Sequence, residues 1–219
     1  MRVAYSQIEM TRRSGKQKVS VLISGFEPFG RFRTNPSEVI VRQYNARGLK
    51  DIDGASVKLT KIILPVHSEV FKVFEKKVGT RRFDLILHFG LAPRARCTRL
   101  ERRARNVLDF LIPDNRGLVI KKKKIKPGGP RYQYTTVSVK AIAKELKAKR
   151  KTVVISNNAG SYICNLLLYR SLLKNKKKRQ PSLVGFVHVP RFSVFSKERS
   201  LSALYIIMKN CIQQVLKRA

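Results

Sequence analysis

A carboxylate, a thiol and an imidazole form the set of side chains in this sequence most suited to covalent catalysis: Glu101, Cys164 and His188. A thiolate can attack a carbonyl carbon, an imidazole can carry the proton, and a carboxylate can hold the imidazole in the right tautomer. The three residues are far apart in the chain, so only folding can bring them together. The sequence therefore predicts cysteine-dependent acyl transfer, provided that the fold joins these segments.

Each of the three residues also has a simpler interpretation. Cys164 can be a small buried hydrophobic residue, and His188 a core histidine near the end of a strand. Glu101 lies among arginines and can be a surface ion-pair partner. The position of Cys164 favours the nucleophile, because it follows a predicted strand and a glycine-containing turn and falls in the first turn of a predicted helix. Unpaired backbone N–H groups and the helix dipole stabilise a thiolate there.

Strand-like and helix-like stretches alternate along the chain. Strands are predicted over 18–26, 56–66, 83–89, 105–112, 152–156 and 182–189. Helices are predicted from Asn35, as N-cap, to Gly48, and over 67–78, 137–149 and 164–173, with a last helix carrying apolar residues between 201 and 215. This alternation predicts a single-domain three-layer α/β/α sandwich with a mixed, mostly parallel central sheet. Active sites of such folds gather beyond the carboxyl ends of the strands.

Length and composition set the class of protein. The 219 residues, 43% of them hydrophobic, are enough for one core, so we expect one domain over 19–219 after a basic, flexible extension over 1–18. The three cysteines, Cys97, Cys164 and Cys211, have neither disulfide-framework nor zinc-site spacing, which favours a reducing compartment. The sequence has no secretory signal and no apolar run long enough to span a bilayer. We therefore expect a cytoplasmic protein without membrane contact.

The net charge is the most unusual global property. The chain has 48 lysines and arginines against 13 acidic residues, a formal charge of +35. Such a surface can bind polyanions, or it can simply be solvated. Two basic runs, 121–124 and 176–179, fall in predicted loops, and neither is interleaved with the aromatic residues that line a single-strand binding groove. We expect only nonspecific contact with nucleic acid.

Several motifs resemble those of one enzyme family. Val21 to Gly30 followed by Asn35-Pro36-Ser37 resembles the opening of the type I pyroglutamyl peptidases, also called pyrrolidone-carboxylate peptidases. His88 to Ala92 leading to Glu101 to Val107 resembles the segment around the family's glutamate. Ser156 to Asn165 resembles the cysteine box, and Gly185 to Pro190 the histidine box. The similarity runs in uninterrupted order over about 19–190.

The resemblance implies a role for each catalytic residue. Cys164 is expected to be the nucleophile, His188 the general base and then acid, and Glu101 the group that orients the imidazole. The implied enzyme is a cysteine-type omega peptidase that removes N-terminal pyroglutamate from peptides through a thioester and requires no metal or organic cofactor. The resemblance also implies a homo-oligomer, since microbial relatives are often tetrameric.

The resemblance further implies a set of substrate-binding residues. Phe26 and Phe29 match the pocket aromatics of the family, Leu91 is expected to offer main-chain groups to the lactam, and Asn35 corresponds to an asparagine near the pocket. Each also has a structural interpretation: core packing for the two phenylalanines and helix capping for Asn35. Pyroglutamate is an uncharged lactam, so apolar walls with a few backbone hydrogen bonds are the expected pocket.

The chain also departs from the family pattern. Leu111 stands where relatives usually have an arginine close to the active site, and Arg94 and Arg96 are candidates to replace that cation. Three hypotheses follow. The first is an active pyroglutamyl peptidase. The second is a weakly active or inactive relative whose basic surface binds nucleic acid or another polyanion. The third is a different cysteine acyl hydrolase on the same scaffold.

Overall fold

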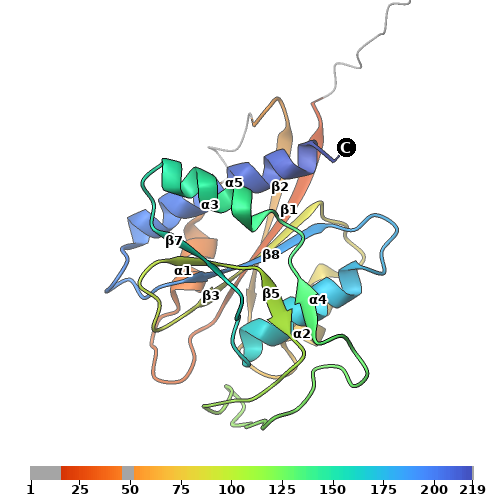
Figure 1. Ribbon diagram of the computed structural model, residues 1–219, viewed down its shortest axis with the longest axis vertical. Helices are drawn as coiled ribbons and strands as arrows, with labels where there is room; N and C mark the ends of the chain where they lie inside the picture. The colour runs from red at the N-terminus through yellow and green to blue at the C-terminus, as the bar shows by residue number, and fades with distance from the viewer. Residues whose placement is uncertain (1–15, 46–51, 219) are drawn as a thin grey trace, which may run out of the picture.

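A six-stranded sheet forms the centre of the protein in a computed structural model that describes residues 16–45 and 52–218 (Figure 1). The strand order is β2-β1-β3-β8-β4-β7. The bounds are β1 Lys18–Phe26, β2 Ser56–Leu64, β3 Leu85–Leu91, β4 Thr98–Glu101, β7 Val153–Ser156 and β8 Leu183–Val189. A separate two-stranded hairpin pairs β5, Arg103–Arg105, with β6, Tyr132–Tyr134.

Helices cover both faces of the sheet. One face carries α1 (Pro36–Gln43), α3 (Val139–Ala148) and α5 (Lys197–Leu216), and the other carries α2 (Val70–Val78) and α4 (Ile163–Asn175), as Figure 1 shows. This confirms the predicted three-layer α/β/α sandwich. The alternation of side chains along each strand divides the apolar residues between two cores, because successive residues of a strand point to opposite faces. Leu87 and Val187 belong to the first core, Ile86 and Phe186 to the second.

The sheet is mixed in a way that matters for the site. Strands β2, β1, β3 and β8 run parallel, whereas β4 pairs antiparallel with β8 and parallel with β7. The mixed, mostly parallel sheet is therefore confirmed. However, the carboxyl ends of β4 and β7 point opposite to that of β8. The catalytic candidates consequently meet on one face of the sheet rather than along a single edge.

Several predicted boundaries differ from those of the structure. The first helix is capped by Asn35, as predicted, but ends at Gln43, and the predicted end at Gly48 lies outside the described residues. The segment 67–69 forms a turn before α2, in which the N–H of Glu69 donates to Nδ1 of His67. The single extended segment predicted over 105–112 is wrong, because only Arg105 belongs to a strand there and Leu108 forms an isolated bridge.

Three short strands, β4, β5 and β6, escaped prediction. Each has three or four residues, too few for an alternating pattern to stand out. Of the predicted extension over 1–18, residues 1–15 lie outside the described part, and Lys18 already begins β1.

The apolar helices serve the core. Leu166, Leu167 and Leu168 in α4 are buried, as are Leu204 and Met208 in α5. Within the described ranges, no helix is both long and apolar enough to cross a membrane.

Candidate active site

Glu101 and His188 form a buried pair. Nδ1 of His188 lies 2.9 Å from Oε1 of Glu101, and the side chains are 8% and 0% exposed. The antiparallel pairing of β4 with β8 creates this contact, because it sets Glu101 opposite Phe186 and thereby on the same sheet face as His188. The interpretation of Glu101 as a surface ion-pair partner is therefore wrong.

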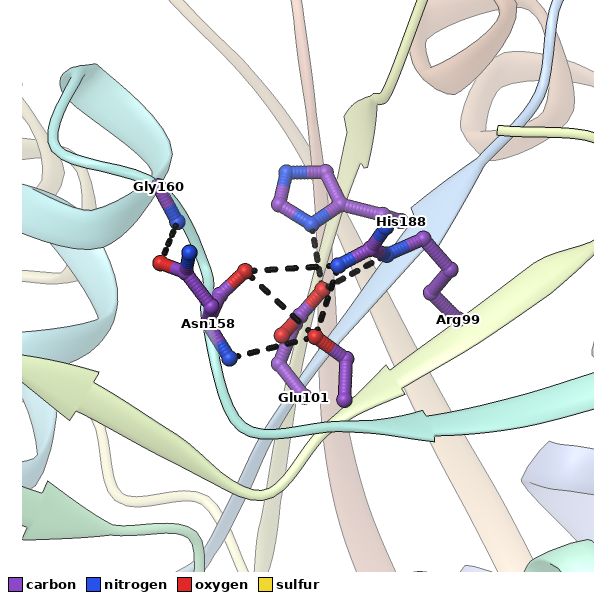
Figure 2. A network of polar contacts seen from close by, with 6 residues as sticks. Arg99, Glu101, Asn158, Gly160 and His188 are labelled. Atoms are coloured by element: carbon purple, nitrogen blue, oxygen red, sulfur yellow. Dashed lines mark hydrogen bonds and ion pairs between the residues drawn. The ribbon is translucent and has the colours of Figure 1, made fainter. Parts of the chain in front are cut away.

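Arg99 supplies the positive charge beside this carboxylate. Its Nε donates to Oε1 of Glu101 at 3.4 Å, while its Nη2 donates to Oγ of Ser156 at 2.8 Å and to the carbonyl of Asn158 at 3.4 Å. Figure 2 shows Arg99 reaching both Glu101 and Asn158. The sequence analysis did not single out Arg99. Recognising β4 as a strand would have revealed it, since residues two positions apart in a strand share a face.

The environment keeps Glu101 ionised. Burial raises the pKa of this carboxyl group, but the hydrogen bond from His188 and the contributions of Ser156 and Arg99 outweigh burial and lower the pKa below its usual value. Oε2 is buried without a hydrogen-bond partner among the described residues, so Oε1 makes the contacts with His188 and Arg99. Glu101 is thus a charged acceptor that fixes Nδ1 of His188 as the N–H donor.

Cys164 occupies the first turn of α4, as predicted. Tyr162 is the N-cap residue, and no side chain in the described ranges caps this end of the helix. A Cβ atom built on Gly90 would lie 2.8 Å from Sγ of Cys164, so the thiol rests directly over Gly90. Gly90 of β3 is the register partner of His188 in β8. The thiol and the imidazole therefore lie over neighbouring positions on the same face of the sheet.

The surroundings of Cys164 favour the protonated thiol. Burial, followed by the negative charge of Glu101, raises the pKa of Cys164 to about 12. The expectation that the helix N-terminus favours a thiolate is therefore outweighed by these two effects. A base must take the proton of Cys164 as the sulfur attacks.

The other two histidines are engaged elsewhere. Nδ1 of His88 lies 2.7 Å from Oγ of Ser24, and its Nε2 lies 3.1 Å from Oγ of Ser171. Burial lowers the pKa of His88 to about 3, which keeps this ring neutral. His67 accepts the N–H of Glu69 in the turn before α2. Among the three histidines, only His188 is paired with a carboxylate in the described structure.

Comparisons with known proteins point to one family. The family model for pyroglutamyl peptidase matches residues 19–202. The chain belongs to the pyroglutamyl peptidase family. It is 38% identical over 176 residues to the pyrrolidone-carboxylate peptidase of Pyrococcus furiosus, covering 78% of this chain and 81% of that protein. It is 34% identical over 185 residues to the pyrrolidone-carboxylate peptidase of Thermococcus kodakarensis, covering 84% of each.

Solved structures of the pyroglutamyl peptidase family share the fold. A mutant pyrrolidone carboxyl peptidase from Pyrococcus furiosus superposes with a TM-score of 0.82 at 32% identity, covering 90% of this chain and all of that one. The resemblance read from the motifs is thereby confirmed over most of the chain.

The residues expected to hold the pyroglutamyl group lie at the ends of β1 and β3. The two strands pair from Val21–Leu85 to Ser24–His88, although β1 continues to Phe26 and β3 to Leu91. The strands therefore separate just beyond His88. Phe26 is buried, with its ring centroid 6.4 Å from that of Phe186. Leu91 is also buried and pairs with Val189 of β8.

Phe29 and Asn35 border the same region from the turn after β1. The ring centroid of Phe29 lies 6.1 Å from that of Tyr162, the N-cap residue of α4. The side chain of Asn35 accepts the N–H of Ser37 at 3.0 Å, and its Nδ2 donates to the carbonyl of Glu27 at 2.9 Å. The capping interpretation of Asn35 is confirmed, and the same contacts also tie the turn that carries Phe29 to α1.

The position where relatives usually have arginine lies in a loop beside Tyr162. Leu111 is 87% exposed, while its neighbour Phe110 packs edge-on against the Tyr162 ring at 4.7 Å. Arg94 and Arg96 are exposed residues of the loop between β3 and β4. The arginine that contacts Glu101 is instead Arg99.

Proposed function

We propose that this protein is a cysteine exopeptidase that removes N-terminal pyroglutamate from peptides, with Cys164, His188 and Glu101 as its catalytic triad. One observation supports this most strongly: a buried carboxylate lies 2.9 Å from the imidazole of His188, whose register partner Gly90 lies under the thiol of Cys164. That is the arrangement which acyl transfer by a thiol requires. Membership of the pyroglutamyl peptidase family identifies the acyl group.

The first chemical step couples proton transfer to attack. Because Nδ1 of His188 faces Glu101, Nε2 is the nitrogen left to take the thiol proton of Cys164. The sulfur attacks the pyroglutamyl carbonyl carbon as the proton leaves, and Glu101 stabilises the imidazolium. His188 then returns the proton to the departing amine, which leaves a thioester. Water, deprotonated by the same imidazole, hydrolyses the thioester and restores the thiol.

The first turn of α4 supplies the oxyanion site. The N–H groups of Ile163, Cys164 and Asn165 belong to the helix start, where backbone donors have no intrahelical acceptor, and Tyr162 offers no side-chain cap. Preorganised backbone donors of this kind stabilise the negative oxygen that develops during attack. We propose that at least one of them binds the carbonyl oxygen of the scissile bond.

We propose that the lactam ring binds between the ends of β1 and β3. Phe26 and Phe29 would form its apolar walls, and the main chain at Leu91, beyond the last β1–β3 pair, would hydrogen-bond the lactam. Asn35 would act by holding the turn that carries Phe29. A lactam has no charge to neutralise, so an apolar pocket suits it.

The decisive experiment follows the release of aminomethylcoumarin from its pyroglutamyl amide under reducing conditions. Wild type should turn over and Cys164→Ala should not, whereas Cys97→Ala, which removes the other partly exposed thiol, should retain activity. Undiminished turnover by Cys164→Ala would refute the assignment of the nucleophile. Faster cleavage of amides with a free N-terminal amine would favour the third hypothesis, a different acyl hydrolase.

The remaining expectations concern partners and location. The comparisons give no support to the hypothesis of an inactive polyanion binder in place of an enzyme. A cytoplasmic location suits a catalytic thiol, which must stay reduced. A tetramer remains the state implied by the family, and light scattering coupled to size exclusion would measure it.

A further inference from the structure

The β5–β6 hairpin presents two arginines and two tyrosines on one face. Arg103 pairs with Tyr134 and Arg105 with Tyr132 across the two strands. Directly paired residues of antiparallel strands share a face, so these four side chains project together. The alternate residues Ala104 and Gln133 are fully buried on the other face, against α4, beside which β5 lies in Figure 1.

The four side chains are arranged as a stacking surface. The guanidinium carbon of Arg103 lies 4.1 Å from the ring centroid of Tyr132, and the two tyrosine rings lie 6.5 Å apart. Tyr134 is 50% exposed. Arg103 is held by the carbonyl of Asn157 and Arg105 by that of Gly160. Backbone acceptors therefore hold the two arginines in place, and the Arg103 guanidinium covers one face of the Tyr132 ring.

A basic groove continues from this face. Its volume is about 490 Å³, and its lining includes Arg105, Lys124, Arg131 and Tyr132 but no carboxylate. The guanidinium of Arg131 lies 5.2 Å from the Tyr132 ring. Lys124 ends the exposed run 121–124. Three cations and the Tyr132 ring thus meet in one groove, although the basic run itself contains no aromatic residue.

We propose that the β5–β6 face and this groove bind single-stranded nucleic acid. Phosphates would lie along Arg105, Lys124 and Arg131, and unstacked bases would stack on exposed Tyr134 and on the stacked pair of Arg103 and Tyr132. A positively charged groove combined with aromatic platforms is the chemistry by which proteins hold single strands without sequence preference. A duplex hides the faces of its bases, so it cannot use the tyrosines. The proposal is independent of the peptidase activity.

The tyrosines provide the sharpest test. Fluorescence anisotropy with fluorescein-labelled dT20 and U20 should give binding that weakens about tenfold in Tyr134→Leu and in Tyr132→Leu, since base stacking is worth about 1–3 kcal/mol. A 20-base-pair duplex should bind more weakly than either single strand. Circular dichroism melts check that each variant is folded. If Tyr132→Leu is unstable, the Tyr134→Leu variant provides the test, because Tyr134 is exposed. Unchanged affinity in a folded Tyr134→Leu variant, or equal binding of the duplex, would overturn the proposal.

Charge-matched variants separate this groove from the general basic surface. The triple variant Lys122→Gln, Lys123→Gln, Lys124→Gln and the triple variant Lys176→Gln, Lys177→Gln, Lys178→Gln each remove three positive charges. Because Lys124 is the one lysine of the three that lines the groove, the first should reduce the slope of log affinity against log salt by about 0.7, the value for one lost phosphate contact. The second should leave the slope nearly unchanged. An equal decrease of the slope in both triple variants would mean that binding depends on net charge alone. That result would refute the proposed binding groove.

Discussion

At the scale of single residues, the electrostatics of the site centre on Glu101. This carboxyl group has no exposed surface, yet its pKa lies below the usual value. Burial acts to raise that pKa, so His188, Ser156 and Arg99 must together outweigh burial. Arg99 is the fixed positive charge among them. We therefore regard Arg99 as a positioning residue that acts through Glu101 on His188.

Replacing Arg99 should change the pH dependence of catalysis. In Arg99→Met the pKa of Glu101 should rise, because one contribution that lowers it is lost. Since Glu101 must be ionised to hold His188, the acid limb of kcat/KM should move to higher pH. Rates measured between pH 4 and 8 test this. Arg103→Met is the matched control: it loses a bond to the same loop, at Asn157, without touching Glu101, and its acid limb should stay in place. If the acid limb of kcat/KM does not move in Arg99→Met, Arg99 does not act on His188 through Glu101.

The protonated thiol of Cys164 leads to a second prediction. Its pKa of about 12 means that the thiolate fraction rises about tenfold per pH unit throughout the neutral and moderately alkaline range. Alkylation of Cys164 by iodoacetamide, measured on a Cys97→Ala background, should therefore accelerate from pH 6 to pH 10 without levelling off. A plateau below pH 8 would instead indicate a preformed thiolate–imidazolium pair.

At the scale of elements, the parallel pairing of β3 with β8 sets Gly90, which lies under the thiol of Cys164, beside His188. Gly90 is needed at this point because a Cβ atom would lie 2.8 Å from Sγ of Cys164 and also 2.8 Å from Cζ of Phe186. Both contacts are shorter than side chains tolerate, so one neighbour would have to move. The site thus depends on a strand residue that has no functional group of its own.

Gly90→Ala should lower activity by more than its loss of folding stability accounts for. We expect a loss of about 1–3 kcal/mol in the free energy of unfolding from overpacking, and at least a tenfold fall in kcat/KM because Cys164 is displaced. Gly185→Ala is the control, since its Cβ would crowd Val137 and Leu87 at 2.7 and 2.9 Å on the opposite face. Denaturant unfolding and initial rates of both variants measure the difference. Equal activity of the two at equal stability would disprove displacement of the thiol.

At the scale of the whole molecule, a formal charge of +35 opposes compaction. The described carboxylates offset little of it, because several of their ion pairs lie on exposed surface, such as Lys72 with Glu69 and Arg116 with Glu69. Mutual repulsion of exposed cations extends over a Debye length and is therefore sensitive to salt.

Salt should consequently stabilise the fold. Raising KCl from 20 to 500 mM should increase the thermal midpoint by roughly 5 °C, about 2 kcal/mol for a domain of this size, because screening weakens cation repulsion. Circular dichroism melts at a fixed pH measure the shift. A midpoint that falls or stays constant would show that the basic residues are not mutually destabilising.

The sequence by itself determined the long elements and predicted the proposed triad. The strands β1 and β8 and the capped start of α1 carry patterns within single stretches of chain, and local motifs mark Glu101, Cys164 and His188. Only the tertiary structure decided that β4 runs antiparallel to β8 and that Arg99 reaches Glu101.

The tertiary structure also decided what surrounds each group. Burial beside Glu101 raises the pKa of Cys164, and the β5–β6 pairing gathers tyrosines and arginines that the sequence keeps apart. The physical reason is the same in each case. Unlike the apolar β7, the short strands β4, β5 and β6 are rich in polar residues and carry too little periodic signal to be recognised. Their pairing, and the desolvation that it causes, depend on segments distant in the chain.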